Sequence, residues 1–120
     1  MRMWMVNPKI MCQKHLCGEH LETHMFLGSL KKRKKLTGFL NNNLFEPRSL
    51  LVRHDQLASE MGSRGYNHKS EIGWAEFYRA YNTLETMQEK HWDIDKESAL
   101  KDLLSRCPEC RKRFTESQSF

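Results

Sequence analysis

Apolar residues recur at spacings of three and four along most of this 120-residue chain. This is the period of an α-helix that buries one face, and it is seen over residues 8–35, 47–62, 74–88 and 95–107. Almost no stretch alternates apolar and polar residues, as a half-buried strand would. The sequence therefore predicts an all-α fold in which three long helices and a fourth pack around one core, behind a short extended N-terminus.

Residues that start and stop helices support this division. Their positions give helix starts at Asn7-Pro8, Pro47 and Asp95, and a stop at Gly62 or Gly65. Residues 66–73 are expected to form a loop. The third helix should carry one face made of Trp74, Phe77, Tyr78, Tyr81, Leu84 and Gln88.

The first helix is expected to run from Pro8 to about Lys35 with two faces of different character. Its apolar arc comprises Ile10, Cys17, Leu21, Met25 and Gly28. The opposite side comprises His15, Glu19, Glu22 and Phe26. We therefore expect the apolar arc to pack on the core.

The length of the chain leaves room for one domain, spanning residues 1–120 with 111–120 as a flexible tail. No run approaches the roughly 18 apolar residues that a membrane span requires. The N-terminal sequence also lacks the apolar stretch of a secretion signal. We therefore expect a cytoplasmic, single-domain monomer with no membrane association and no small-molecule cofactor.

The charge of the chain is unbalanced. Its 20 Lys and Arg residues against 15 Asp and Glu give a formal charge of +5, which favours an anionic partner such as nucleic acid. The cations form two blocks, Lys31-Lys32-Arg33-Lys34-Lys35 and Arg111-Lys112-Arg113. The dipole of a helix also favours cations at its C-terminal end without any ligand. Both a phosphate-binding surface and a solvated helix end are therefore open.

The four cysteines lie at positions 12, 17, 107 and 110. Without a secretion signal we expect no disulfide. Cys107 and Cys110 have the spacing of a zinc knuckle, but a second C-x-x-C is missing, and Cys12 and Cys17 are five apart. A zinc site that joins this pair to Cys12, Cys17 or His15 is geometrically possible. The expectation is nevertheless no bound metal, with Cys12 and Cys17 as ordinary helix residues and a free C-terminal dithiol.

The stretch 15–24, HLCGEHLETH, concentrates titratable groups in ten residues. It is compatible with the wet face of an amphipathic helix. His20 and His24, at i and i+4, are also able to bind one metal ion, although the glutamate of a zinc-protease helix is absent. In a third interpretation His15, Glu19 and Glu22 share one face and serve acid–base chemistry.

A resemblance favours the third interpretation. Residues 14–32, KHLCGEHLETHMFLGSLKK, resemble the first helix of the pyrimidine-dimer DNA glycosylases, a phage base-excision repair family of the endonuclease V type. Residues 53–67, RHDQLASEMGSRGYN, are similar to that family's middle helix and the Arg-Gly-aromatic-Asn after it. The N-terminal MRMW with Asn-Pro-Lys resembles short phage and archaeal members. The resemblance covers residues 1–67 and implies a compact all-α domain.

The resemblance implies a DNA glycosylase that also cleaves abasic sites as a lyase, through an imine. The α-amine of the first residue attacks C1′ of the damaged nucleotide, and a glutamate stabilises the cationic sugar and assists β-elimination. An α-amine ordinarily has a pKa of about 7.7–8.0, so a useful fraction is unprotonated at neutral pH, unlike a Lys amine near 10.4. A carboxylate supplies negative charge where positive charge develops.

Carried onto this sequence, the resemblance gives four catalytic positions. The nucleophile falls on Met1, the arginine beside it on Arg2, the helix histidine on His15 and the glutamate on Glu22. Because Arg2 is too bulky for ordinary removal of the initiator methionine, the amine of Met1 itself is the expected nucleophile. We expect these four residues to converge.

The expected partner is damaged double-stranded DNA, with pyrimidine dimers as the lesion that the resemblance implies. Two arginines with which the family grips DNA fall on Leu21 and Met25, and the neighbouring His20 and His24 could replace them with a pH-dependent charge. The candidate phosphate contacts are Lys31, Lys32, Arg33, Lys34, Arg48, Arg111, Lys112 and Arg113.

Enzymes that act on a nucleotide inside a duplex must unstack it, and an aromatic side chain can take the place of the base. Trp4 or Phe114 could serve here, although Trp4 is equally compatible with the core, and Trp74 and Trp92 are expected in the core. Two alternatives remain open: a non-catalytic nucleic-acid-binding module on the same scaffold, and a small protein-interaction protein.

Overall fold

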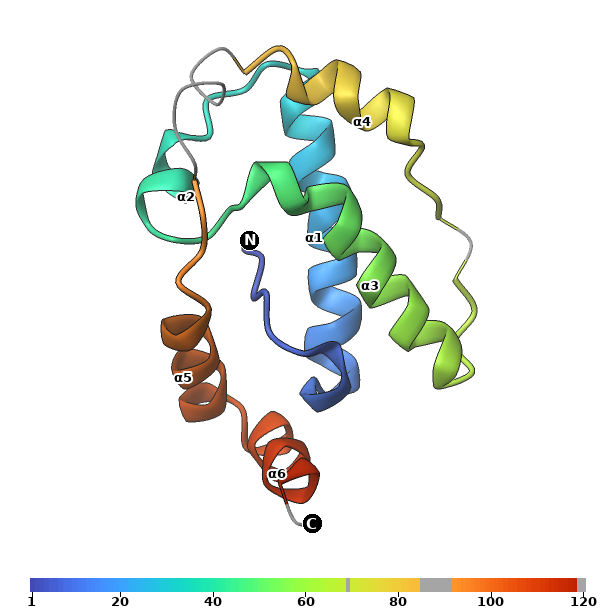
Figure 1. The fold of residues 1–120 in the computed structure, drawn as a ribbon, viewed down its shortest axis with the longest axis vertical. Helices are drawn as coiled ribbons and strands as arrows, with labels where there is room; N and C mark the ends of the chain where they lie inside the picture. Colours follow the sequence, from blue (N-terminus) through green and yellow to red (C-terminus); the bar gives the residue numbers. More distant parts are fainter. Residues whose placement is uncertain (69, 85–91, 119–120) are drawn as a thin grey trace.

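The structure, a computed structural model, describes residues 1–68, 70–84 and 92–118. These ranges form an all-α fold and contain no β-strand. The helices in Figure 1 are α1 (Gln13–Lys31), α2 (Thr37–Asn41), α3 (Leu50–Ser63), α4 (Trp74–Tyr81), α5 (Lys96–Arg106) and α6 (Pro108–Ser117). Short 3-10 helices, Pro8–Ile10 and Pro47–Ser49, precede α1 and α3. None of these helices is long and apolar enough to cross a membrane.

The long helix α1 lies at the centre of the fold, and α3 crosses and packs against it (Figure 1). The short helix α4 also contacts α1, whereas α6 contacts α5 and the first 3-10 helix. The N-terminal segment runs between α1 and α5 (Figure 1). The first and last parts of the sequence therefore meet beside the central helix.

The apolar core divides into two clusters along α1. One gathers around Phe26, and the other joins Leu16 to the C-terminal helices through Leu103. Met3 belongs to the first cluster and Trp4 to the second. The N-terminal segment is therefore buried against both, and it is part of the core rather than a loose lead-in.

The first helix is shorter than predicted. It begins at Gln13 rather than Pro8, because the backbone at the N-cap, Cys12, is extended with φ −70° and ψ 165°. Asn7 and Pro8 instead start the separate 3-10 helix, where the Asn7 side chain accepts a hydrogen bond from the Lys9 amide at 3.0 Å. Asn7 and Pro8 therefore do begin a helix, but it is the three-residue 3-10 helix and not α1.

The predicted orientation of α1 was wrong for several residues. Leu21 and Met25, placed on the apolar arc, are 59% and 50% exposed. Glu19 and Phe26, placed on the opposite side, are buried. The reason is that Glu19 forms an ion pair with Arg53 of α3 inside the fold. The buried face of α1 therefore contains a charged residue, and polarity alone does not show which face is exposed to solvent.

The second helix is confirmed, since α3 follows the 3-10 turn at Pro47 and ends at Ser63. The described part of the predicted loop, residues 66–68 and 70–73, belongs to no helix. The cap of the fourth helix is also confirmed: Asp95 accepts a hydrogen bond from the Ser98 amide at 3.1 Å at the start of α5. Both boundaries depend on local chemistry, which explains why the sequence alone shows them.

Three other segments differ from the prediction. The third helix ends at Tyr81, and its predicted end, Gln88, lies outside the described residues. The helices α2 and α6 were not predicted. Of the segment 111–120, for which a flexible tail was expected, residues up to Ser117 are helical.

Candidate active site at the N-terminus

Backbone hydrogen bonds hold the first residues in place. The Met3 amide donates to the Leu44 carbonyl at 2.8 Å, and the Arg2 amide donates to Oε2 of Glu22 at 3.0 Å. Only three covalent bonds separate the Met1 α-nitrogen from the Arg2 amide nitrogen, so the amine lies within about 7 Å of this carboxylate. The fold therefore brings the amine of Met1 and the carboxylate of Glu22 together.

The Arg2 side chain fastens this segment to the C-terminal half of the chain. Its Nη1 donates to Oδ2 of Asp102 on α5 at 2.9 Å, and its guanidinium lies 3.7 Å from the ring centroid of Trp4. Burial lowers the pKa of Arg2, and the charge of Asp102 opposes that shift. Trp4 is buried under this contact, which places it in the core rather than on a base-stacking surface.

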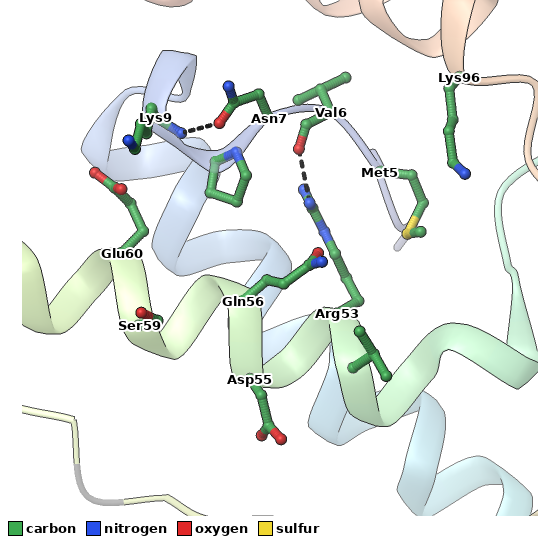
Figure 2. A pocket seen from close by; sticks show the side chains of 12 residues that line it. Met5, Val6, Asn7, Lys9, Arg53, Asp55, Gln56, Ser59, Glu60 and Lys96 are labelled. Atoms are coloured by element: carbon green, nitrogen blue, oxygen red, sulfur yellow. Dashed lines mark hydrogen bonds between the residues drawn. The ribbon is translucent and has the colours of Figure 1, made fainter.

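A buried ion pair fixes the next part of the N-terminal segment. Glu19 of α1 accepts from Arg53 of α3 through both oxygens, at 2.5 Å from Nε and 2.8 Å from Nη2. The Nη1 of Arg53 donates to the carbonyl of Val6 at 2.7 Å, as Figure 2 shows. Because Arg53 is only 2% exposed, one side chain ties α1, α3 and the N-terminal segment together without solvent.

A cavity of about 750 Å³ lies next to Arg53, between the N-terminal segment and α3 (Figure 2). It is lined by Met5, Val6, Asn7, Pro8, Lys9, Val52, Arg53, Asp55, Gln56, Ser59, Glu60 and Lys96. Met1 and Glu22 are not among these residues, so the cavity is separate from the amine–carboxylate pair.

His15 is half-buried and faces cysteines. Its Nδ1 lies 3.2 Å from Sγ of Cys12 and 3.8 Å from Sγ of Cys110, and its ring meets that of Trp4 edge-on at a centroid distance of 5.9 Å. Burial, with a smaller effect of Lys14, lowers the pKa of His15, while the charge of Glu22 acts in the opposite direction. The ring of Trp4 therefore contacts both His15 and the guanidinium of Arg2. The Nδ1 atom of His15 faces the cysteines instead.

The other histidines of the sequence motif lie in a cluster between α1, α3 and the loop after α3. His20 and His24 contact His54, and His20 Nε2 lies 2.7 Å from Nε2 of His68. Burial, and then the neighbouring imidazoles, lower the pKa of His20 to about 4. The structure thus places His20 in the interior, not on a surface that could replace the missing family arginines.

Ring nitrogens of His20, His54 and His68 lie within 4.8 Å of one another, which is close enough to share a metal ion. However, both nitrogens of His54 already face oxygen acceptors, Oδ1 of Asp55 at 2.9 Å and the Ser70 carbonyl at 3.0 Å. These contacts connect α3 to the following loop. They indicate a hydrogen-bonded packing cluster rather than a preformed metal site.

The candidate phosphate contacts fall into two groups. Residues 31–35, which begin with the last residue of α1, are all exposed, and Lys31 pairs with Glu76 of α4. The second group is engaged with the protein: Arg48 pairs with Asp93, Arg111 donates to the Leu104 carbonyl, and Arg113 donates to the Lys9 carbonyl, whereas Lys112 is exposed. The first block is therefore the freer cationic surface.

The exposed aromatic rings are not those that the sequence indicated. Trp74, expected in the core, is 70% exposed, and Tyr78 one turn later on α4 is 50% exposed. The two rings meet at a centroid distance of 6.1 Å. The same helix, α4, carries Glu76, which pairs with Lys31 of the cationic block. Phe114 packs against the second hydrophobic cluster instead.

The fold and the site define a small helical protein that sets the amine end of the chain against a carboxylate on its longest helix. A sequence model of the family described as pyrimidine dimer DNA glycosylase matches residues 1–73. The chain therefore belongs to this family. No curated protein and no solved structure matches the chain.

Sequence reasoning missed residues whose partners are distant in the chain. Arg53 lies inside the recognised stretch 53–67, but its pairing with Glu19 had no local signal. Asp102 joins Arg2 across 100 residues, and no motif marked it. For the cysteines a signal did exist: Cys12-x-x-His15 has the same spacing as Cys107-x-x-Cys110.

Proposed function

We propose that this chain is a DNA glycosylase with an abasic-site lyase step, acting on pyrimidine dimers in double-stranded DNA. The observation that carries the proposal is the hydrogen bond from the amide of Arg2, the residue next to Met1, to the carboxylate of Glu22. Membership of the pyrimidine dimer DNA glycosylase family supports the reaction class and the DNA partner. The chain would work on DNA in the cytoplasm.

The proposed reaction uses the amine as a nucleophile. The unprotonated nitrogen of Met1 donates its electron pair to C1′ while the glycosidic bond breaks, and the electron pair of that bond leaves with the base, which takes up a proton. Nitrogen then loses a proton, and its electron pair forms the C=N bond as the C1′–O4′ bond breaks and O4′ takes up a proton, which gives the protonated imine. The Glu22 carboxylate stabilises the positive charge on the sugar, then accepts the C2′ proton as the C3′–O bond breaks.

Arg2 and His15 serve this chemistry through position. The Arg2 side chain, held by Asp102 and stacked on Trp4, limits where the preceding residue can move. His15 supports the same Trp4 ring from its edge, and its Nδ1 is directed to Cys12. We therefore assign both as positioning residues, with Met1 and Glu22 as the groups that touch the reacting atoms.

The DNA-binding surface is proposed at the end of α1. Met1 packs against the hydrophobic cluster that contains Leu30 and Leu36, the buried residues on either side of the cationic block 31–35. The same hydrophobic cluster therefore contacts Met1, the proposed nucleophile, and holds both ends of the exposed cationic block. The phosphates would lie on this block, and the rings of Trp74 and Tyr78 offer a face on which a base can stack.

Borohydride trapping tests the proposal. Intact mass first establishes that Met1 is the N-terminal residue of the purified chain, which is then incubated with abasic-site DNA and reduced. We expect a covalent adduct that peptide mapping places on the Met1 nitrogen. The Glu22→Gln variant should trap or cleave at least about 100-fold more slowly, because one charge-stabilising group is lost. Glu97→Gln, an exposed carboxylate on α5, is the matched control and should react normally.

Other outcomes separate the alternatives. Tight, salt-sensitive binding without an adduct would show a non-catalytic nucleic-acid-binding module, since the salt slope reports the number of phosphates contacted. An adduct on a lysine would refute Met1 as the nucleophile. No DNA affinity at moderate salt would leave a protein-interaction role. Cleavage of duplexes with a single pyrimidine dimer, compared with undamaged duplexes, tests the lesion.

A further inference from the structure

Two short motifs come together where α1 and α6 begin. Cys12 is the N-cap of α1 and His15 is its third residue, while Cys107 is the N-cap of α6 and Cys110 is its third residue. The motifs C-x-x-H and C-x-x-C therefore occupy equivalent positions on two helices. They are separated by more than ninety residues of sequence, yet their side chains converge on one point.

The distances between these side chains fit a tetrahedral site. The three sulfurs and the imidazole nitrogen all lie within 4.8 Å of one another. Sγ of Cys12 is 3.7 Å from Sγ of Cys107, and His15 Nδ1 is 3.2 Å from Cys12 Sγ and 3.8 Å from Cys110 Sγ. Four ligands around zinc at about 2.3 Å for sulfur and 2.0 Å for nitrogen require separations of about 3.5–3.8 Å.

Backbone amides at the starts of both helices point at the sulfurs. The Cys12 amide donates to Cys110 Sγ at 3.2 Å, and the Cys110 amide donates to Cys107 Sγ at 3.3 Å. The positive ends of two helix dipoles point at the same sulfurs. All three cysteines are buried, and the hollow beside them is lined by two cations, Lys14 and Arg106, and by one carboxylate, Glu109.

We infer that Cys12, His15, Cys107 and Cys110 bind one structural zinc ion. Four protein ligands fill a tetrahedral shell and leave no open position for water or substrate, so the site is structural rather than catalytic. Three soft thiolates with one imidazole select zinc over the hard cations Mg²⁺ and Ca²⁺. The inference stands on these four residues alone and does not depend on the proposed glycosylase function.

The site would attach α6 to the start of α1. The family match covers residues 1–73, so Cys107 and Cys110 lie in the part of the chain that it does not include. The metal would hold this C-terminal part, with Asp102 on the adjoining α5, against the segment that carries Arg2. It would thereby fix the region of the fold on which the N-terminal amine depends.

Metal analysis of the full-length chain tests the inference. The chain is purified under reducing conditions without chelators, and zinc and iron per chain are measured. We expect about one zinc per chain, and less than about a tenth in Cys110→Ser and Cys107→Ser. Cys17→Ser is the matched control and should retain the zinc, since Cys17 is outside the group of four. Cobalt(II) added to the metal-free wild-type chain should give the intense visible absorption of tetrahedral thiolate coordination. This measurement identifies thiolate ligands without using a variant, so it stands even if the cysteine variants do not fold.

Three results would overturn the inference. The first is a reduced, folded wild-type chain that takes up neither zinc nor cobalt. The second is a metal that Cys110→Ser retains and His68→Gln loses, which would assign it to the histidine cluster. The third is a metal-free chain in which peptide mapping without reduction shows a disulfide between Cys12 and Cys107.

Discussion

Replacing Glu19 by glutamine should strongly destabilise the fold. The substitution keeps the shape of the side chain but removes the charge that faces Arg53, which is 2% exposed and contacts Glu19 through two nitrogens. Removing one partner of a buried ion pair leaves an uncompensated charge, at about 3–5 kcal/mol. A domain of this kind has a free energy of unfolding of about 5–15 kcal/mol, so the loss is a large fraction of the total.

Urea unfolding followed by circular dichroism measures this effect. With a slope of about 2 kcal/mol per molar urea, the midpoint for Glu19→Gln should fall by about 1.5–2.5 M. The control is Glu97→Gln, which breaks an exposed pair with Lys101 at 3.7 Å and should change the free energy of unfolding by less than about 1 kcal/mol.

A double variant tests whether the loss in free energy of unfolding comes from the uncompensated buried charge. Glu19→Leu combined with Arg53→Met removes both charges, so it should be less destabilised than either single variant. Full recovery is not expected, because the Val6 carbonyl loses its donor, at about 1–3 kcal/mol. If Glu19→Gln behaves like Glu97→Gln, or if the two single losses simply add, the ion pair does not hold the fold as argued.

The remaining predictions concern the site, the surface and the environment. Arg2→Pro removes the amide that binds Glu22 and should reduce trapping at least about tenfold, whereas Arg2→Lys keeps the amide and should trap more, as quantified gel assays would show. Trp74→Ala and Tyr78→Ala should each weaken DNA binding by about 1–3 kcal/mol in fluorescence anisotropy without changing the thermal midpoint, since both rings are exposed. The folded-state pKa of His20, about 4, lies below the unfolded value of 6.5, so its contribution to stability is full above pH 6.5 and is lost as pH falls toward 4. The free energy of unfolding, from urea curves at pH 7.5 and 5, should therefore change less in His20→Gln than in wild type, by about 2 kcal/mol at most. A strong zinc chelator should lower the thermal midpoint of wild type and leave that of Cys110→Ser unchanged, because metal binding is coupled to folding.

The sequence predicts those parts of the fold that depend on neighbouring residues. Asp95 caps α5 and Pro47 precedes α3 because capping and proline geometry act over a few positions. The orientation of α1 could not be predicted in this way, since Glu19 is buried only because Arg53, 34 residues later, neutralises it. Trp74 was wrongly expected in the core, because the short helix α4 buries Phe77 and leaves the tryptophan outside.

The candidate site follows the same distinction. Met1 and Glu22 were predicted from a stretch near the N-terminus that resembles a known family, and in the structure the amide of the next residue, Arg2, donates a hydrogen bond to Glu22. Asp102 could not be assigned a partner, and for Cys110 the sequence left Cys12, Cys17 and His15 open, because the contacts with Arg2 and Cys12 are set by how the chain closes on itself. Spacing identifies what a residue could bind, whereas the tertiary fold decides which residue it meets.

The contact between Arg2 and Asp102 also bears on the order in which the protein is made. The two residues are 100 positions apart, so during synthesis the first segment emerges long before its partner. Contacts of such high sequence separation form late, because the intervening chain must first lose conformational freedom. A nascent chain that has produced only residues 1–73, the region matched by the family model, therefore lacks Asp102, the partner of Arg2. On the ribosome, the contact between Arg2 and Asp102 can form only after α5 has left the exit tunnel.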